Sequence, residues 1–300
     1  MKQITFITFL FTLTLLAACN GEQATDTATE TTETSKETLK TMLELVWESD
    51  TLLSTCESAL YDAASGLIYV SNINENPWED DGNGFISTLD TDGNILDLKW
   101  VEGLSAPKGM GIADGKLYVS DNSSLVEIDL SEQKIINRYE IADSPNLNDV
   151  TVSAEGDVYV SGSASDAIYV LKDGQLETVI EYDFGRLNGL LHRPEGLYYA
   201  SSGSSNFGIL DTKTNTPKVL ASEIGNGDGI ILLDNGDFVV SSWKGQVFYI
   251  NSSDWTPEKI LDTEAQSMNA ADIGYVTGKN LLIVPTFFGN KVMAYRVVRS

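Results

Sequence analysis

The chain has 300 residues, and its 44 acidic residues outweigh 19 basic ones to leave a formal net charge of −25. Nucleic-acid binding needs clustered Lys and Arg to neutralise phosphates, so this balance excludes a nucleic-acid partner. A single histidine, His192, and two cysteines, Cys19 and Cys56, also limit the chemistry that the side chains can perform.

The first 18 residues have the pattern of a secretory signal. Lys2 precedes an apolar stretch, residues 4–16, that is too short to span a bilayer comfortably. The sequence Leu-Ala-Ala-Cys at residues 16–19 resembles the lipobox of bacterial lipoproteins, whose cysteine is lipidated and becomes the mature N-terminus. We therefore predict a signal peptide over residues 1–18 and lipidation of Cys19. The protein is then extracytoplasmic, in the bacterial cell envelope, and touches the membrane through its N-terminal lipid only.

Residues 19–42 contain this cysteine and a Thr- and Glu-rich tether with no core-forming pattern. The sequence Leu-Glu-Leu-Val-Trp-Glu follows at residues 43–48 and alternates apolar and polar residues, as a strand does. A helical lead-in is the alternative, because residues 37–45 could also form a helical turn or two. We expect one globular domain over residues 43–300.

A unit of 40 residues recurs through this domain. Asn148, Asn188 and Asp228 follow one another at that step, each opening an apolar stretch, and Lys108 lies 40 residues before the first. Each stretch leads to a Gly-containing turn and then to a run such as Val-Tyr-Val-Ser at residues 158–161. Such turns favour hairpins, and Tyr and Val favour strands. The period predicts an all-β fold, a six-bladed β-propeller of four-stranded blades.

The strand count predicts how the propeller closes. Residues 272–300 have room for about three strands at the usual strand and turn lengths. The fourth strand of the last blade is therefore expected from residues 43–48, which would leave no unpaired gap between the first and last blades.

Propeller geometry then sorts the polar residues by face. We expect the first residue of each unit, here called its head, to lie at the central channel. The heads are Glu57, Lys108, Asn148, Asn188, Asp228 and Asp272. The same face should carry the loop 72–84, predicted to form a lid or rim, and the segments 243–245 and 287–289. His192 falls in a turn on the far face, which excludes histidine-based catalysis, and Cys56 is expected to be a buried, inert thiol.

Four of the heads carry side-chain oxygens that could bind a metal ion. Glu57, Asn148, Asn188 and Asp228 supply two carboxylates and two amide carbonyls from four blades, the ligand types that Ca²⁺ prefers. The alternative is a channel lining that is polar for solvation alone.

These head residues resemble the calcium-dependent lactonase propellers typified by regucalcin and gluconolactonase. The resemblance covers residues 52–296, and its specific part is the residue type at Glu57, at the Asn148-Asp149 pair, at Asn188-Gly189 and at Asp228-Gly229. It implies a divalent metal in the channel, most simply Ca²⁺ with Zn²⁺ or Mn²⁺ as alternatives, and Asp228 as both ligand and general base.

Three positions depart from that family. Asn146 stands where its enzymes often place an arginine two residues before the Asn-Asp pair, Ser58 replaces a glycine, and Lys108 occupies a channel position. The metal site can therefore survive while the sugar-lactone specificity does not.

Two functions of different classes follow. The first is a metal-dependent hydrolase of lactones or other cyclic esters, acting on a small-molecule substrate at the channel mouth. The second is a non-enzymatic, NHL-like propeller that binds a ligand or a protein. We expect a monomer in either case. The expected substrate-binding residues are Lys108, Asn146, Trp243, Asp272 and Trp78, with Phe287 and Phe288 as further apolar walls.

Overall fold

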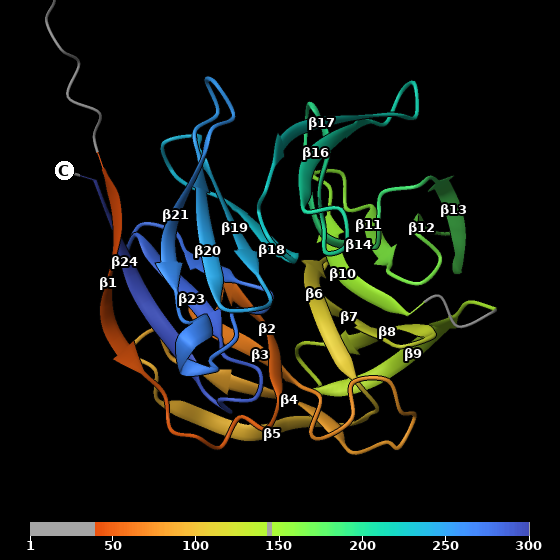
Figure 1. The fold of residues 1–300 in the computed structure, drawn as a ribbon. Coiled ribbons are helices and arrows are strands. Elements are labelled where there is room, and N and C mark those ends of the chain that lie inside the picture. The colour runs from red at the N-terminus through yellow and green to blue at the C-terminus, as the bar shows by residue number, and fades with distance from the viewer. Residues whose placement is uncertain (1–39, 143–145, 300) are drawn as a thin grey trace, which may run out of the picture. The chain divides into compact units, whose positions relative to one another are not determined.

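The computed structural model describes residues 40–142 and 146–299, which belong to one compact unit (Figure 1). The predicted signal peptide, Cys19 and most of the tether lie outside these residues and stay predictions. Within the described part, six separate four-stranded antiparallel sheets follow one another along the chain. The six-bladed propeller of four-stranded blades is therefore confirmed. No helix among the described residues is long and apolar enough to cross a membrane.

The blades are named one to six in chain order. Blade one contains β2 (Cys56–Asp62), β3 (Leu67–Asn72), β4 (Gly84–Leu89) and β5 (Ile95–Leu104). Blade two contains β6 (Pro107–Ala113), β7 (Lys116–Asp121), β8 (Ser124–Asp129) and β9 (Lys134–Glu140). Blade three contains β10 (Leu147–Val152), β11 (Val158–Gly162), β12 (Ala167–Lys172) and β13 (Gln175–Glu181).

Blade four contains β14 (Leu187–Arg193), β15 (Gly196–Ser201), β16 (Asn206–Asp211) and β17 (Thr216–Ser222). Blade five contains β18 (Gly227–Leu232), β19 (Phe238–Ser242), β20 (Gln246–Ile250) and β21 (Pro257–Asp262). A single 3₁₀ turn, η1 (Glu264–Gln266), follows, and blade six contains β22 (Gly274–Val276), β23 (Leu281–Pro285), β24 (Val292–Arg299) and β1 (Thr41–Glu48).

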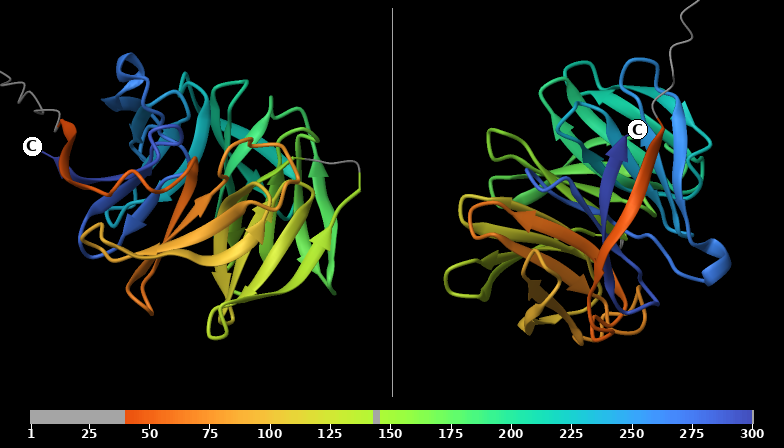
Figure 2. Two further views of the ribbon diagram at one scale, coloured as in Figure 1. Left: turned by 90° about the horizontal axis from the view of Figure 1, so that it is seen from below. Right: turned by 90° about the vertical axis from the view of Figure 1, so that its left-hand side faces the viewer.

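Blade six joins the two ends of the domain. β1 pairs antiparallel with β24, from Thr41 opposite Arg299 to Glu48 opposite Met293. Figures 1 and 2 show these two strands side by side, although they come from opposite ends of the chain. The predicted closure is confirmed and the helical alternative is wrong for these residues. The strand begins at Thr41, two residues inside the stretch assigned to the tether, because the pairing with β24 continues that far.

The first strand of each blade lies at the centre of the ring, where β2, β6, β10, β14, β18 and β22 contact one another in turn. A serine near the end of the second strand links blades two, three and five to the blade that follows each of them. Ser161 Oγ accepts the Asp149 N–H at 2.9 Å in its own blade and donates to the Asn188 carbonyl of the next at 2.6 Å. Ser241 does the same with the Gly229 N–H and the Ala271 carbonyl. These bonds satisfy backbone groups that the strand ladder leaves open at the channel.

Close approach of these central strands explains the glycine that follows a head. A Cβ on Gly189 would overlap the carbonyl oxygen of Asp228, and one on Gly229 would overlap the Asp272 carboxylate. Only glycine lets two backbones pack this tightly. The Asn-Gly and Asp-Gly pairs of the repeat are therefore a packing requirement of the channel.

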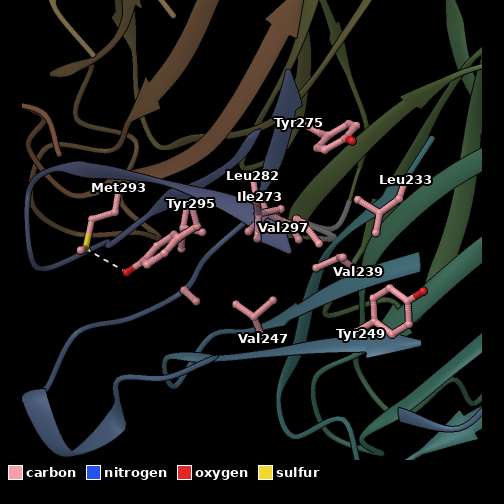
Figure 3. Close-up of a cluster of buried hydrophobic side chains, with 12 residues drawn as sticks. Leu233, Val239, Val247, Tyr249, Ile273, Tyr275, Leu282, Met293, Tyr295 and Val297 are labelled. Atoms are coloured by element: carbon pink, nitrogen blue, oxygen red, sulfur yellow. Dashed lines mark hydrogen bonds between the residues drawn. The ribbon is translucent and has the colours of Figure 1, made fainter. Parts of the chain in front are cut away.

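Apolar side chains fill the space between adjacent sheets. Figure 3 shows the layer between blades five and six, where Val239 and Val247 of one sheet face Leu282 and Tyr295 of the other. All four are buried, and Leu282 has no exposed surface. Similar clusters lie between the other pairs of blades. The alternation of apolar residues that predicted the strands thus builds the core that fixes the channel.

Candidate functional site

One end of the central channel opens into a cavity of about 390 Å³, here called the head-face cavity. Its lining residues are Glu57, Pro77, Trp78, Lys108, Asn148, Arg186, Asn188, Ser202, Asn226, Asp228, Trp243, Lys244, Phe287 and Phe288. Nine of the residues predicted for the site are among them, including the apolar walls Phe287 and Phe288. All four expected metal ligands, Lys108 and both tryptophans therefore share one cavity.

The two carboxylates of this cavity are buried close to other negative charges. Burial and then the charge of Asp228 raise the pKa of Glu57 well above its usual range. Burial and then the charge of Asp272 raise the pKa of Asp228 in the same way, while the positive charge of Arg186 opposes the shift. Groups in this environment ionise readily only when a cation joins them.

Two oxygens facing this region lack partners. Glu57 Oε2 and Asn188 Oδ1 are buried and accept no hydrogen bond. Asn148 uses its amide nitrogen to donate to Ser163 Oγ at 3.0 Å, which leaves its side-chain oxygen as the group available to the channel. Buried acceptors are normally satisfied, so a set of open oxygens beside Asp228 is an arrangement that a hard cation would complete.

The composition of this set decides which metal it suits. Nowhere in residues 40–142 and 146–299 do three or more His, Cys, Asp or Glu side chains form a metal-ligating group. Glu57 and Asp228 would need the amide oxygens of Asn148 and Asn188 to complete the coordination. All-oxygen ligands of this kind fit Ca²⁺ better than Zn²⁺, which favours nitrogen and sulfur.

Lys108 is buried, with 2% of its surface exposed, and is tied to the loop between β3 and β4. Its ammonium donates to the carbonyl oxygens of Pro77 and Ala106, each at 2.9 Å, and to Asn122 Oδ1 at 3.4 Å. An ammonium has three protons, so these acceptors occupy all of them. Burial lowers its pKa to about 8. Its predicted contact with a substrate anion stays a prediction, and in this conformation it fastens the loop.

The loop between β3 and β4 lies where the lid was expected, because Trp78 lines the head-face cavity. Asn122 holds the same loop by donating to the Glu79 carbonyl at 3.2 Å and to Asp80 Oδ1 at 2.9 Å. The loop is therefore a fastened rim of the cavity in this structure.

Arg186 and Asn226 belong to the cavity and were missed from the sequence. Each lies two residues before a head, at the position that Asn146 occupies in blade three. Asn146 itself does not line the cavity, so its predicted contact with substrate is not supported by its placement. The arginine expected two residues before the Asn-Asp pair is thus present one blade later, as Arg186. It lies 40 residues after Asn146, so the repeat itself points to it.

Asp272 was expected at the head face, and the structure places it elsewhere. It lines a second cavity of about 580 Å³ at the other end of the channel, together with Ser58 and Asp149. The reason is that Asp272 is shifted by one residue from the head position of blade six. Ser241 donates to the Ala271 carbonyl as Ser161 does to Asn188, so Ala271 is the head of blade six and Asp272 is one residue beyond it.

The other nucleophile and base candidates stay out of the site. His192 lines neither cavity, and its ring stacks on Tyr159 with centroids 5.6 Å apart. Cys56 is fully buried and donates to the Lys291 carbonyl, and burial raises the pKa of its thiol to about 12. The expectation that this thiol is buried is confirmed, and a buried thiol with a raised pKa is expected to be unreactive.

A scan against known protein families found no match to this chain, and a search among curated proteins found none either. Solved structures do match it. A catalytically inactive virginiamycin B lyase from Staphylococcus aureus, with one histidine replaced by alanine and crystallised with quinupristin, is 12% identical with a TM-score of 0.61. The match covers 87% of this chain and 100% of that chain.

A streptogramin B lyase structure is 11% identical with a TM-score of 0.62, over 87% of this chain and 98% of that chain. A chain of the nidogen/laminin complex is 14% identical with a TM-score of 0.61, over 74% of this chain and 85% of that one. At these identities the likeness shows the β-propeller fold alone.

Proposed function

We propose that this protein is a metal-dependent hydrolase of lactones or related cyclic esters, with a divalent cation, most simply Ca²⁺, bound in the head-face cavity. The observation that carries the proposal is the pair of buried oxygens without partners, Glu57 Oε2 and Asn188 Oδ1, beside the buried carboxylate of Asp228. The residue types at the heads, which resemble those of the regucalcin and gluconolactonase propellers, support it.

Glu57, Asn148, Asn188 and Asp228 would hold the cation. When bound, it would polarise the ester carbonyl, activate water and keep the neighbouring carboxylates ionised. Asp228 then has the position and charge of a general base, because it is 2% exposed yet lines the cavity. Trp78 and Trp243, which both line the cavity, would limit access of water to the ester.

The solved lyases suggest another reaction, which the residues do not favour. The virginiamycin B lyase structure is of a variant made inactive by replacing a histidine. The one histidine of this chain stacks on Tyr159 and lines neither cavity. Chemistry that depends on a histidine at the head face therefore has no candidate residue here.

Ligand binding without turnover is the second candidate. It is favoured by the large apolar side chains at the cavity mouth, since Phe288 is 61% exposed and Trp78 is 39% exposed. Exposed aromatic residues of this size often mark an interaction site. In either function the protein is proposed to be a monomer that acts outside the cytoplasm, anchored through Cys19.

A panel of lactones and esters, assayed with Ca²⁺, Mn²⁺, Zn²⁺ or chelator, tests the proposal. We expect hydrolysis that chelator abolishes and Ca²⁺ restores, with calorimetric Ca²⁺ binding that Glu57→Gln weakens. His192→Ala is the matched control and should change neither measurement. Tight metal binding with no hydrolysis across the panel would support the binding protein, and absence of metal binding would overturn both the site and the mechanism.

A further inference from the structure

The mouth of the head-face cavity has an aromatic side built from the loops of blades one, five and six. Trp243 packs edge-on against Phe287 at 5.5 Å between centroids, and Phe287 packs edge-on against Phe288 at 4.7 Å. Trp78 brings a fourth ring to the lining of the cavity, and the Lys108 ammonium lies 4.3 Å from its ring centroid. Phe287 is buried while Phe288 and Trp78 are exposed, so the cluster presents its outer rings to the opening.

The lining of the same cavity carries two positive charges. Arg186 and Lys244 line the cavity, and neither forms an ion pair with any residue that the structure describes. The charge of Arg186 also acts on the buried carboxylate of Asp228, whose raised pKa it lowers. Ser202 and Asn226 also line the cavity and bring hydrogen-bonding groups.

Arg186 is held in place by a dedicated contact. The Asp166 carboxylate accepts the backbone N–H groups of Gly185, Arg186 and Leu187, at 2.9, 3.2 and 2.7 Å. The backbone of the turn is therefore fixed while the guanidinium stays free. A guanidinium is suited to a carboxylate or another planar anion, which it can bind through two parallel hydrogen bonds.

We infer that this mouth recognises a small ligand that carries an apolar ring and an anionic group, with the ring against Trp243 and Phe288 and the anion on Arg186. The inference rests on the proposed function in that it uses the same cavity, and it names the substrate class. The substrate is a ring-bearing anionic ester or lactone, and a neutral polyhydroxylated lactone lacks both features. Four aromatic rings offer a polyol few hydrogen bonds, whereas they stack well on another ring.

Three probes separate these features, and none requires turnover. We take 2-naphthoate as the anionic ring, 2-naphthamide as its neutral analogue and gluconate as an anion without an apolar ring. Binding is measured by calorimetry on the full-length protein, with saturating Ca²⁺ and again with chelator. We expect 2-naphthoate to bind at least tenfold more tightly than either of the other probes, because it alone meets both sides of the mouth.

Two substitutions assign the contacts. Arg186→Gln should abolish the preference for 2-naphthoate over 2-naphthamide, and Trp243→Ala should weaken both naphthalene probes at least tenfold while sparing gluconate. Arg296→Gln, which removes an exposed arginine of β24 outside both cavities, is the matched control and should change no affinity. Melting temperatures of the variants check that each one is folded.

The outcomes distinguish this inference from the proposed function. Equal affinities for 2-naphthoate and gluconate would overturn the role of the aromatic side. If chelator abolishes the binding of 2-naphthoate and Arg186→Gln leaves it unchanged, the anion binds the metal. That result would overturn the role of Arg186. If the wild-type protein hydrolyses no substrate but still prefers 2-naphthoate to 2-naphthamide, and Arg186→Gln removes that preference, the inference holds while the hydrolase proposal fails.

Discussion

The Lys108 ammonium lies 4.3 Å from the centroid of the Trp78 ring and donates a hydrogen bond to the carbonyl of Pro77, the residue before it. A buried cation of the channel thus holds an aromatic residue of the rim. This contact links the interior of blade two with the loop of blade one, and it explains why a lysine is accommodated beside a channel otherwise lined by acids and amides.

Replacing this cation should loosen the rim. Lys108→Met keeps the apolar stem but leaves the carbonyls of Pro77 and Ala106 without their donor, which should lower the free energy of unfolding by about 2 kcal/mol. Urea denaturation measures the loss, and limited proteolysis should show faster cleavage near residues 79–81. Lys99→Met, at an exposed ion pair with Glu102, is the control and should change stability little. Unchanged protection of the loop would show that Lys108 does not fasten it.

The fold and most of the site could be predicted because the 40-residue step is a geometric property of the blades. Residues at the same position of successive units must reach the same level of the channel, so the metal-ligand candidates Glu57, Asn148, Asn188 and Asp228 were found together in one cavity. The same reasoning placed Trp78 at the rim and His192 away from the site.

The errors arose where the step is broken or where contacts are distant in sequence. Asp272 follows Asp228 by 44 residues, and with η1 inserted between them nothing in the sequence says that Ala271 takes the head position. The partners of Lys108 come from residues 77, 106 and 122, which only the folded chain brings together. Arg186 is visible in the repeat, because it precedes the head Asn188 by two residues as Asn146 precedes Asn148.

Closure of the ring should depend on Trp47. This residue packs against the core between blades six and one and donates its indole N–H to the Thr91 carbonyl at 3.0 Å. Trp47→Ala should therefore lower the free energy of unfolding by about 2 kcal/mol, less than for a fully buried tryptophan. Leu45→Ala on the same strand is the control, because Leu45 is 54% exposed. Equal urea midpoints for the two variants would contradict the importance of this strand for closure.

Metal-free protein should be more stable in mild acid than at neutral pH. Burial raises the pKa of Asp272 to about 7, with a hydrogen bond from Ser58 opposing the shift, and the pKa values of Glu57, Asp149 and Asp228 are also raised. Between about pH 4 and pH 7 the folded state then binds more protons than the unfolded chain, whose carboxyls ionise near pH 4. The free energy of unfolding therefore falls as pH rises through this window, by up to about 1.4 kcal/mol per pH unit for each group.

Thermal melts in chelator between pH 4.5 and pH 7.5 measure this slope. Asp272→Asn should flatten it, and Asp92→Asn, an exposed turn residue, should leave it unchanged. Excess Ca²⁺ should raise the melting temperature most at pH 7.5, because protons and the cation compete for Glu57 and Asp228. A metal-free melting temperature that rises steadily from pH 4.5 to pH 7.5 would contradict the raised pKa values.

The lipid anchor is tested on the precursor. If Cys19 is lipidated, Cys19→Ser should leave an uncleaved precursor that takes up no fatty acid, since the modified cysteine is the new N-terminus. Metabolic labelling with a fatty acid, followed by mass measurement of the mature chain, gives the result. Cys56→Ser is a control for the labelling alone, because Cys56 is buried in the folded domain. A wild-type protein that stays unlabelled would refute the anchor.

Asp228 gives the most direct test of the mechanism. Asp228→Asn keeps the shape of the side chain and one oxygen, but removes the negative charge and the capacity to accept a proton. We expect a folded protein with weaker Ca²⁺ binding and hydrolysis reduced at least about 10²-fold, the usual loss for a general base. Asn188→Ala should weaken metal affinity first, so that excess Ca²⁺ restores part of its activity. Comparing the two variants at saturating Ca²⁺ separates proton transfer from metal binding. If Asp228→Asn then hydrolyses substrate at the wild-type rate, Asp228 is a ligand at most and the base must be sought elsewhere in the cavity.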